Sequence, residues 1–145
     1  MTGVVRLAIG SLFGALVVAS LLAGVVIREA PAQHGAKVKI TGKVTDKIIQ
    51  HFGASGLSGA RSIEYRRLVM EPGARMEGLM VMDDHVEFCI VEKGGVTVTE
   101  AGGAKNTYKA GDVFVKPKGL KQTVITADPQ QGYVELYWKI NLKGH

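Results

Sequence analysis

Glu87 is the residue whose type and position point most directly to chemistry. It lies in an expected strand, residues 85–91, whose two alternating sides are both largely apolar, so its carboxylate should be enclosed and should need partners. His85 has the same parity and therefore lies on the same face, about 6.6 Å away along the strand. A glutamate and a histidine at this spacing could share a divalent metal ion, or act as a general base and its partner.

Turns rich in glycine and proline divide the region after residue 60 into short strands. They lie at residues 71–73, 94–95, 111 and 117–119. The turn at Gly94-Gly95 predicts a hairpin between the strand of Glu87 and residues 96–99. Residues 133–142 alternate cleanly between two faces, as a half-buried strand does. Eight or nine strands at short, regular spacing predict an all-β sandwich or barrel.

The order and spacing of these residues resembles the two motifs of the cupin superfamily. Six residues separate Glu87 from Gly94, as the end of the first motif requires. The second motif, a glycine followed after five residues by Pro-x-Gly, is matched by Gly111, Pro117 and Gly119. The resemblance implies a cupin-like double-stranded β-helix, a jelly-roll barrel, over residues 60–145.

The chain departs from the family's pattern at the metal ligands. The position of His-x-His in the first motif is taken, in the two registers that fit, by Met80 and Met82 or by Leu79 and Val81. Gln122 stands where the second motif has its histidine. Of the usual three histidines and one glutamate only Glu87 is left, and thioethers bind iron, manganese, nickel or zinc poorly. The resemblance therefore implies the fold and argues against the usual metal chemistry.

A small group of side chains is the candidate ligand-binding site: Glu87, His85, Gln122, Met80 and Met82. No catalytic residue is assigned and no cofactor is predicted. The alternative is an incomplete site in which His85, Glu87 and Gln122 hold a divalent metal. Cys89 is the single cysteine, so no intramolecular disulfide can form, and it is expected to be a small buried hydrophobe.

Residues 1–32 are interpreted as a signal-anchor or a signal peptide. Leu7 to Ile27 is a run of 21 residues without a charge. As a helix it would be about 30 Å long, the thickness of the hydrocarbon core of a bilayer. The run is either an uncleaved membrane anchor, or it is removed after Ala32, which ends a small-x-small site. Both alternatives predict an extracytoplasmic domain, either anchored in the membrane or periplasmic or secreted.

Residues 33–59 are expected to link this segment to the barrel and to contain two short elements. Residues 37–41 alternate as a strand does. Residues 48–52 are predicted to form a short helix that is capped by Thr45 and stopped by Gly53.

The charge of the chain is modest and excludes one class of function. The formal net charge is +5. Basic and aromatic residues are not interleaved, and an export signal leads away from nucleic acid, so nucleic-acid binding is not expected. The lysines of the carboxy-terminal part are interpreted as a solvated face, with an anionic ligand or membrane surface as the alternative: Lys105, Lys109, Lys116, Lys118, Lys121, Lys139 and Lys143.

These observations lead to two functional hypotheses. The first is a membrane-tethered or exported cupin-domain protein that binds a small molecule without catalysis, or that is an accessory subunit of a membrane complex. The alternative is a metal-dependent cupin enzyme, of the oxygenase or isomerase type, with altered ligands. A homodimer is also plausible by resemblance. In that case the outward Phe88 and Ile90 would be covered by a second copy, and otherwise by the amino-terminal strands.

Overall fold

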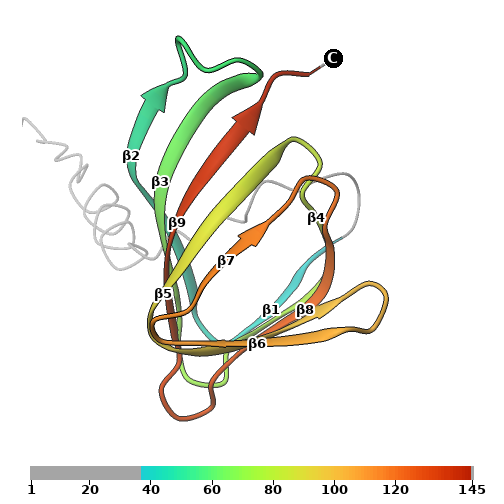
Figure 1. Ribbon diagram of the computed structural model, residues 1–145. Helices are drawn as coiled ribbons and strands as arrows, with labels where there is room; N and C mark the ends of the chain where they lie inside the picture. The colour runs from blue at the N-terminus through green and yellow to red at the C-terminus, as the bar shows by residue number, and fades with distance from the viewer. Residues whose placement is uncertain (1–36, 145) are drawn as a thin grey trace, which may run out of the picture. The chain divides into compact units, whose positions relative to one another are not determined.

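The computed structural model describes residues 37–144, which form nine β-strands and no helix (Figure 1). The strands are β1 Lys39–Thr41, β2 Val44–Gly53, β3 Ala60–Met70, β4 Arg75–Val81, β5 His85–Glu100, β6 Lys105–Lys109, β7 Val113–Lys116, β8 Lys121–Ala127 and β9 Tyr133–Leu142. The all-β prediction is confirmed for this part of the chain. None of it forms a helix long and apolar enough to cross a membrane. The predicted signal segment, residues 1–32, lies outside the described residues.

The strands form one antiparallel sheet that curls into a half-barrel. Its path is β1-β4-β8-β5-β9-β3-β2, and β6 and β7 pair with β5 beside that path. Figure 1 shows β2, β3 and β9 on one side of the half-barrel and β1, β4 and β8 on the other. The barrel that the strand spacing predicted, and that the resemblance implied to be a jelly roll, is therefore present as a partly open half-barrel.

The long strand β5 joins the two sides. Its first part pairs with β9 and β7, and its last part pairs with β8 and β6. The prediction of a hairpin at Gly94-Gly95 is wrong, because strand β5 continues through both residues. Gly94 has a φ of +71°, and a Cβ on it would lie 2.0 Å from the carbonyl oxygen of Gly132. The glycine thus permits a close approach of two backbones where β5 passes between the two sides.

The strand β2 replaces the predicted short helix of residues 48–52, and that prediction is wrong. Residues Val44–Gly53 pair with β3 along their whole length, with an irregularity after Ile48. The β-branched residues Ile48 and Ile49 suit an extended chain, and the backbone of β3 supplies hydrogen-bond partners along the whole strand. An isolated helix of five residues would lack that support. The predicted strand at residues 37–41 is confirmed as β1, which pairs with β4.

The apolar core occupies only part of the interior. Its buried residues are Met70, Ala74, Val91, Val96, Val98, Ile125, Ala127 and Tyr133. Along β5 the inward positions change from Val91 to Cys89, Glu87 and His85 as the strand is followed toward its start, and all four are buried. The interior near the start of β5 is therefore polar, which an ordinary core is not.

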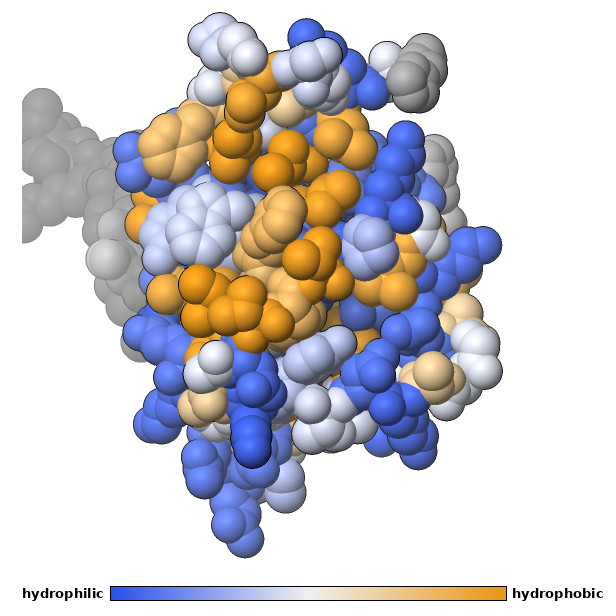
Figure 2. All heavy atoms as spheres, viewed as in Figure 1, coloured by the Kyte–Doolittle hydropathy of each residue, from blue (hydrophilic) through white to orange (hydrophobic). Residues whose placement is uncertain are grey.

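The outer face of β5, β7 and β9 is apolar. Phe88 lies opposite Val115 of β7 and Trp138 of β9, and these side chains keep exposed fractions of 44%, 48% and 37%. Val113, also on β7, is 69% exposed. Figure 2 shows apolar side chains gathered on this face. The described amino-terminal strands do not cover it, because β1 pairs with β4 and β2 with β3. We call this surface the apolar outer face.

Candidate functional site

Three neighbouring strands place a group of charged side chains inside the half-barrel. Glu87 and Cys89 lie at alternate positions of β5, so both are on its inward face. On β9, Tyr137 lies opposite Cys89, and Glu135 lies opposite Val91. Lys116 is the last residue of β7 and is the cross-strand partner of Glu87. The register of these antiparallel pairs, and no local sequence motif, brings the side chains together.

Lys116 is the cation of this group. Its Nζ donates hydrogen bonds to Glu87 Oε2, at 2.9 Å, and to Glu135 Oε1, at 3.1 Å. The residue is only 6% exposed. Nζ also lies 5.6 Å from the ring centroid of Phe114 and 5.5 Å from that of Tyr137, within the range of cation–π attraction. We call Lys116, Glu87 and Glu135 the Lys116 centre.

The charge state of Lys116 follows from its neighbours. Burial alone would lower the pKa of Lys116, but the carboxylates of Glu135 and Glu87 outweigh that effect and raise the pKa well above its usual value. The side chain is therefore an ammonium group at any physiological pH. A protonated amine has no lone pair, so Lys116 cannot act as a nucleophile or form a Schiff base in this state.

Glu87 is held in its ionised form. Burial alone would raise the pKa of Glu87, but the charge of Lys116 and the contact with His85 lower it to about 2. His85 Nε2 lies 3.4 Å from Glu87 Oε1, and His85 Nδ1 lies 2.8 Å from Asp84 Oδ1. The structure thus brings His85 and Glu87 together, as their parity predicted. Glu87 is an anion with a fixed cation, and it lacks the raised pKa of a general acid.

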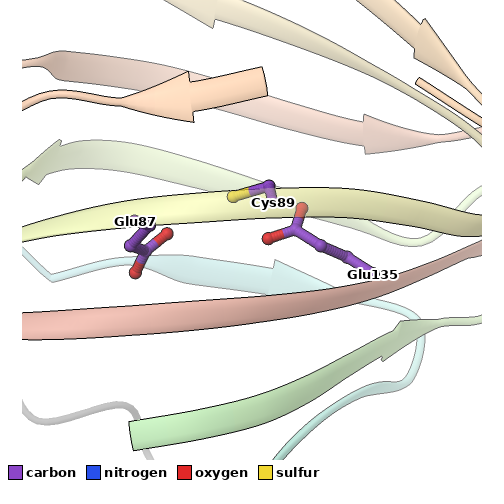
Figure 3. A group of neighbouring side chains, drawn as sticks. All are labelled: Glu87, Cys89 and Glu135. Carbon is purple, nitrogen blue, oxygen red and sulfur yellow. The ribbon is translucent and has the colours of Figure 1, made fainter. Parts of the chain in front are cut away.

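Glu135 and Cys89 complete the buried part of the site. The hydroxyl of Tyr133 donates to Glu135 Oε2, and Glu135 is 1% exposed. Cys89 is fully buried, as predicted, and burial raises the pKa of its thiol above the usual value. Figure 3 shows Glu87 and Cys89 on β5 with Glu135 beside them. Cys89 is therefore a neutral thiol beside charged groups and is not a reactive thiolate.

A second cluster is centred on Arg66 of β3. The guanidinium binds Asp46 through Nε at 3.2 Å and Nη2 at 2.7 Å, and it binds Glu64 through Nη1 at 2.6 Å. The side chains of Arg66, Glu64 and Asp46 are 17%, 16% and 31% exposed. Asn141 donates to Glu64 at 3.3 Å and to buried Ser62 at 3.0 Å. We call Arg66, Asp46 and Glu64 the Arg66 cluster.

Tyr137 connects the two groups. Its hydroxyl donates to Asp46 Oδ2 at 2.9 Å, and its ring centroid lies 5.9 Å from Arg66 Cζ and 5.5 Å from Lys116 Nζ. Burial, followed by the charge of Asp46, raises the pKa of the Tyr137 hydroxyl above its usual value, so it stays a hydrogen-bond donor. The Lys116 centre and the Arg66 cluster therefore form one polar inner face that runs from buried to partly exposed.

The other residues predicted for the site lie on β4, β8 and the turn after β4. Gln122 is 3% exposed, is the cross-strand partner of Met80, and its Oε1 has no hydrogen-bond partner among the described residues. Met80 packs against the apolar core, and Met82 is 8% exposed. The described residues show no hydrogen bond between Gln122 and either His85 or Glu87. A ligand-binding role for Gln122, Met80 and Met82 stays a prediction.

Several residues of the polar inner face were not predicted. The prediction that Lys116 lies on a solvated basic face is wrong, because Lys116 is buried. The other lysines of that group are exposed or half-buried, as expected. The alternation of β9 contained a signal for Glu135, because it shares a face with Tyr133 and Tyr137. No comparable signal marked Lys116 or Arg66.

Glu87 stands where the motif that it resembles has a metal ligand, so the fit of these residues to a metal ion matters. Ligand atoms of Glu87, Cys89 and Glu135 all lie within 4.8 Å of one another, so the group could hold a metal. However, both carboxylates already bind the ammonium of Lys116. A divalent ion would have to displace that buried cation, so the residues as they stand do not fit one.

A hollow on the outer surface is a weaker candidate. It has a volume of about 190 Å³ and is lined by Lys43, Thr45, Lys47, Arg67, Val69 and Glu71. Its ion pairs, Lys43 with Glu71 and Arg67 with Glu92, are exposed and worth little. The polar inner face is therefore the better candidate site.

Comparisons with known proteins identify the fold. A family model described as the EutQ-like cupin domain matches residues 78–133. The cupin domain of Schizosaccharomyces pombe Cnp3 has a TM-score of 0.54 and 13% identity, covering 71% of this chain and 68% of that one. The fold of the described residues is therefore that of the cupins. A cupin-like protein from Thermotoga maritima has a TM-score of 0.53 and 24% identity over 70% of this chain and 71% of its own.

The similar cupins differ in what they are described to do. A predicted oxalate decarboxylase of Thermotoga maritima has a TM-score of 0.54 and 22% identity, covering 71% of this chain and 84% of that chain. At these identities the likeness shows the fold alone. A search of curated protein sequences gave no match. The function of this cupin must therefore be argued from its own residues.

Proposed function

We propose that this cupin binds a small polar molecule at the polar inner face and does so without a metal ion. It would act as a binding protein or as an accessory subunit of a larger complex. The observation that carries this proposal is the polar inner face itself, which combines the buried Lys116 centre with the partly exposed Arg66 cluster. A purely structural barrel has no need for such an interior.

The energetic cost of this interior supports a functional role. Buried charges must be paired to be tolerated, and replacing a buried ion pair by apolar residues is often neutral or stabilising. This domain nevertheless keeps Glu87, Lys116 and Glu135 buried in its interior. Ionised groups that are costly to stability, and that continue into a partly exposed cluster, are more easily explained by a ligand than by folding.

The charge balance of the polar inner face indicates the ligand's chemical class. It contains four carboxylates, those of Asp46, Glu64, Glu87 and Glu135, and the cations of Lys116 and Arg66. Four negative and two positive charges leave an excess of two negative charges, without counting His85. Carboxylate oxygens accept hydrogen bonds, so the face favours a ligand that donates them, such as a sugar, a polyol or a small amine. An anionic ligand would meet repulsion.

A thermal-shift comparison tests the proposal. The protein is heated with neutral sugars and polyols, with small amines, and with organic acids of similar size. We expect members of the first two groups to raise the melting temperature and the acids to have no effect. Glu64→Gln should weaken the response, whereas Lys118→Met, a change at an exposed lysine outside the face, should leave it intact. A response only to the acids, or to none of the compounds, would refute the proposal.

The second candidate function is a metal-dependent enzyme with altered ligands. It is favoured by the short distances between the ligand atoms of Glu87, Cys89 and Glu135. In that case the purified protein should contain a stoichiometric transition metal by elemental analysis. Glu87→Gln should then remove the metal and any turnover while the fold is kept. Unchanged metal content in that variant would exclude this alternative.

We propose in addition that residues 7–27 hold the domain at a membrane or direct its export. The support is the uncharged run of 21 residues, long enough to span a bilayer. Membrane fractionation with sequencing of the mature amino terminus tests it. An intact terminus in the membrane fraction indicates an anchor, and a new terminus after Ala32 indicates cleavage. Intact protein in the soluble cytoplasmic fraction would contradict both.

The apolar outer face is the surface that we propose for a homodimer. Phe88, Val113, Val115 and Trp138 are neighbours in the sheet and exposed, and a two-fold axis would place this patch against the same patch of a second copy. Sedimentation velocity should show a dimer that Val113→Asp dissociates. Ala104→Asp, in an exposed turn, is the matched control and should leave the dimer intact. A monomeric parent protein would refute this part of the proposal.

A further inference from the structure

We infer that Lys116 is the resident cation of this centre, and that its ammonium closes a latent metal site formed by Glu87, Cys89 and Glu135. At the Lys116 centre an internal ammonium group thus balances the two carboxylates in place of a divalent ion. This inference concerns the identity of the cation and does not depend on which ligand binds the polar inner face.

The first support is the position of the ammonium. Nζ of Lys116 lies 2.9 Å from Glu87 Oε2 and 3.1 Å from Glu135 Oε1, so a single atom bridges the two carboxylates. A metal ion bound by the same two residues would bridge them in the same way. The ammonium therefore lies where the ion would have to lie.

The second support is that both oxygens of each carboxylate already have a partner. Glu87 Oε1 is in contact with Nε2 of His85, and Glu135 Oε2 accepts from the hydroxyl of Tyr133. Each carboxylate thus uses one oxygen for Lys116 and the other for a second partner. An incoming ion would have to break these contacts and would face the positive charge of Lys116 at close range.

The third support is that moving the Lys116 ammonium away from the two carboxylates would be energetically unfavourable. It is 6% exposed, and its Nζ lies over the rings of Phe114 and Tyr137. If an ion displaced it, its charge would stay buried without a carboxylate partner, which is strongly unfavourable. We therefore expect the parent protein to exclude divalent ions from this centre.

The inference has a consequence that a merely structural lysine would not have. Without Lys116, two carboxylates and a thiol with ligand atoms within 4.8 Å would have no cation. A set of two oxygens and one sulfur suits zinc or cobalt, and a bound metal would deprotonate the thiol. Removing the lysine should therefore create metal affinity.

Cobalt(II) titration tests this consequence, because a cobalt–thiolate bond gives a near-ultraviolet charge-transfer band. The samples are the parent protein, Lys116→Met, and Lys116→Met combined with Cys89→Ser. We expect no band from the parent protein and a stoichiometric band from Lys116→Met, with cobalt bound at least about tenfold more tightly. The double variant should lose the band. Lys118→Met, at an exposed lysine, is the matched control and should behave as the parent.

Two results of the cobalt titration would contradict the inference. A stoichiometric cobalt–thiolate band in the parent protein would overturn the inference, because Lys116 would then not exclude metal. A folded Lys116→Met variant without added cobalt affinity would overturn the latent site. If Lys116→Met does not fold, Lys116→Gln provides a neutral replacement that retains a hydrogen-bond donor, and the same band decides. Failure of the sugar, polyol and amine experiment above would leave this result unaffected.

Discussion

Replacing Lys116 by methionine should destabilise the domain strongly at neutral pH and much less in acid. Methionine fills a similar volume without a charge, so the substitution removes the cation and leaves Glu87 and Glu135 buried without it. Removing one partner of a buried ion pair typically costs about 3–5 kcal/mol. That is a large part of the roughly 5–15 kcal/mol that stabilises an ordinary domain.

The lowered pKa of Glu87 independently indicates how much stability the loss of Lys116 should cost. The pKa of Glu87 falls from 4.5 to about 2, against the effect of burial, and the charge of Lys116 is the largest contribution that lowers it. A shift of this size corresponds to about 3 kcal/mol of stabilisation of the ionised form at neutral pH, since one unit is about 1.4 kcal/mol. The typical cost of breaking a buried ion pair and the pKa shift of Glu87 therefore both give a loss of a few kcal/mol in the free energy of unfolding.

The pH dependence should have opposite signs in the two proteins. In the parent, the pKa of Glu87 is lower in the folded than in the unfolded state, so its contribution is present above pH 4.5 and is lost as the pH falls toward 2. Without Lys116, burial dominates and the folded-state pKa of Glu87 should rise above the unfolded value. Glu87 then favours folding in acid and opposes it as the pH rises through that raised pKa.

Urea unfolding at pH 7, 5.5 and 4, followed by far-ultraviolet circular dichroism and by the fluorescence of the single tryptophan, Trp138, measures both effects. The deficit of Lys116→Met relative to the parent should be largest at pH 7 and shrink toward pH 4. Lys118→Met, which is exposed, should follow the parent within about 0.5 kcal/mol. A deficit below about 1 kcal/mol at pH 7, or one that grows toward acid, would refute the reasoning.

Three further changes test separate contacts. Glu87→Gln should flatten the loss of stability between pH 4.5 and 2, and an unchanged acid profile in urea unfolding would contradict the assignment of that loss to Glu87. Tyr137→Phe removes the hydrogen bond to Asp46 and should cost about 1–2 kcal/mol in thermal unfolding; no change would show that this bond contributes nothing. Gly94→Ala should cost at least about 3 kcal/mol, because its Cβ would meet a backbone oxygen at 2.0 Å, whereas Gly102→Ala, in open space, should be nearly neutral; equal effects would be inconsistent with the close approach.

The sequence predicted the fold where local residues carry the information. The all-β class and the turn-strand-turn of residues 111–119 follow from glycine, proline and alternating apolar residues. Two local predictions failed because tertiary pairing decided the outcome. β2 is a strand because β3 lies beside it, and β5 continues through Gly94 because it has partners on both sides of the half-barrel.

The candidate site divides in the same way. The sequence by itself determined that Glu87 is enclosed, that His85 shares its face, and that the histidines of the cupin motifs are absent. Only the tertiary structure decided which cation forms an ion pair with Glu87. Lys116 is 29 residues away and looks like any other lysine of a basic region, until the pairing of β7 with β5 buries it opposite Glu87. Strand register is a long-range property, so local sequence cannot distinguish a buried counter-ion from a solvated lysine.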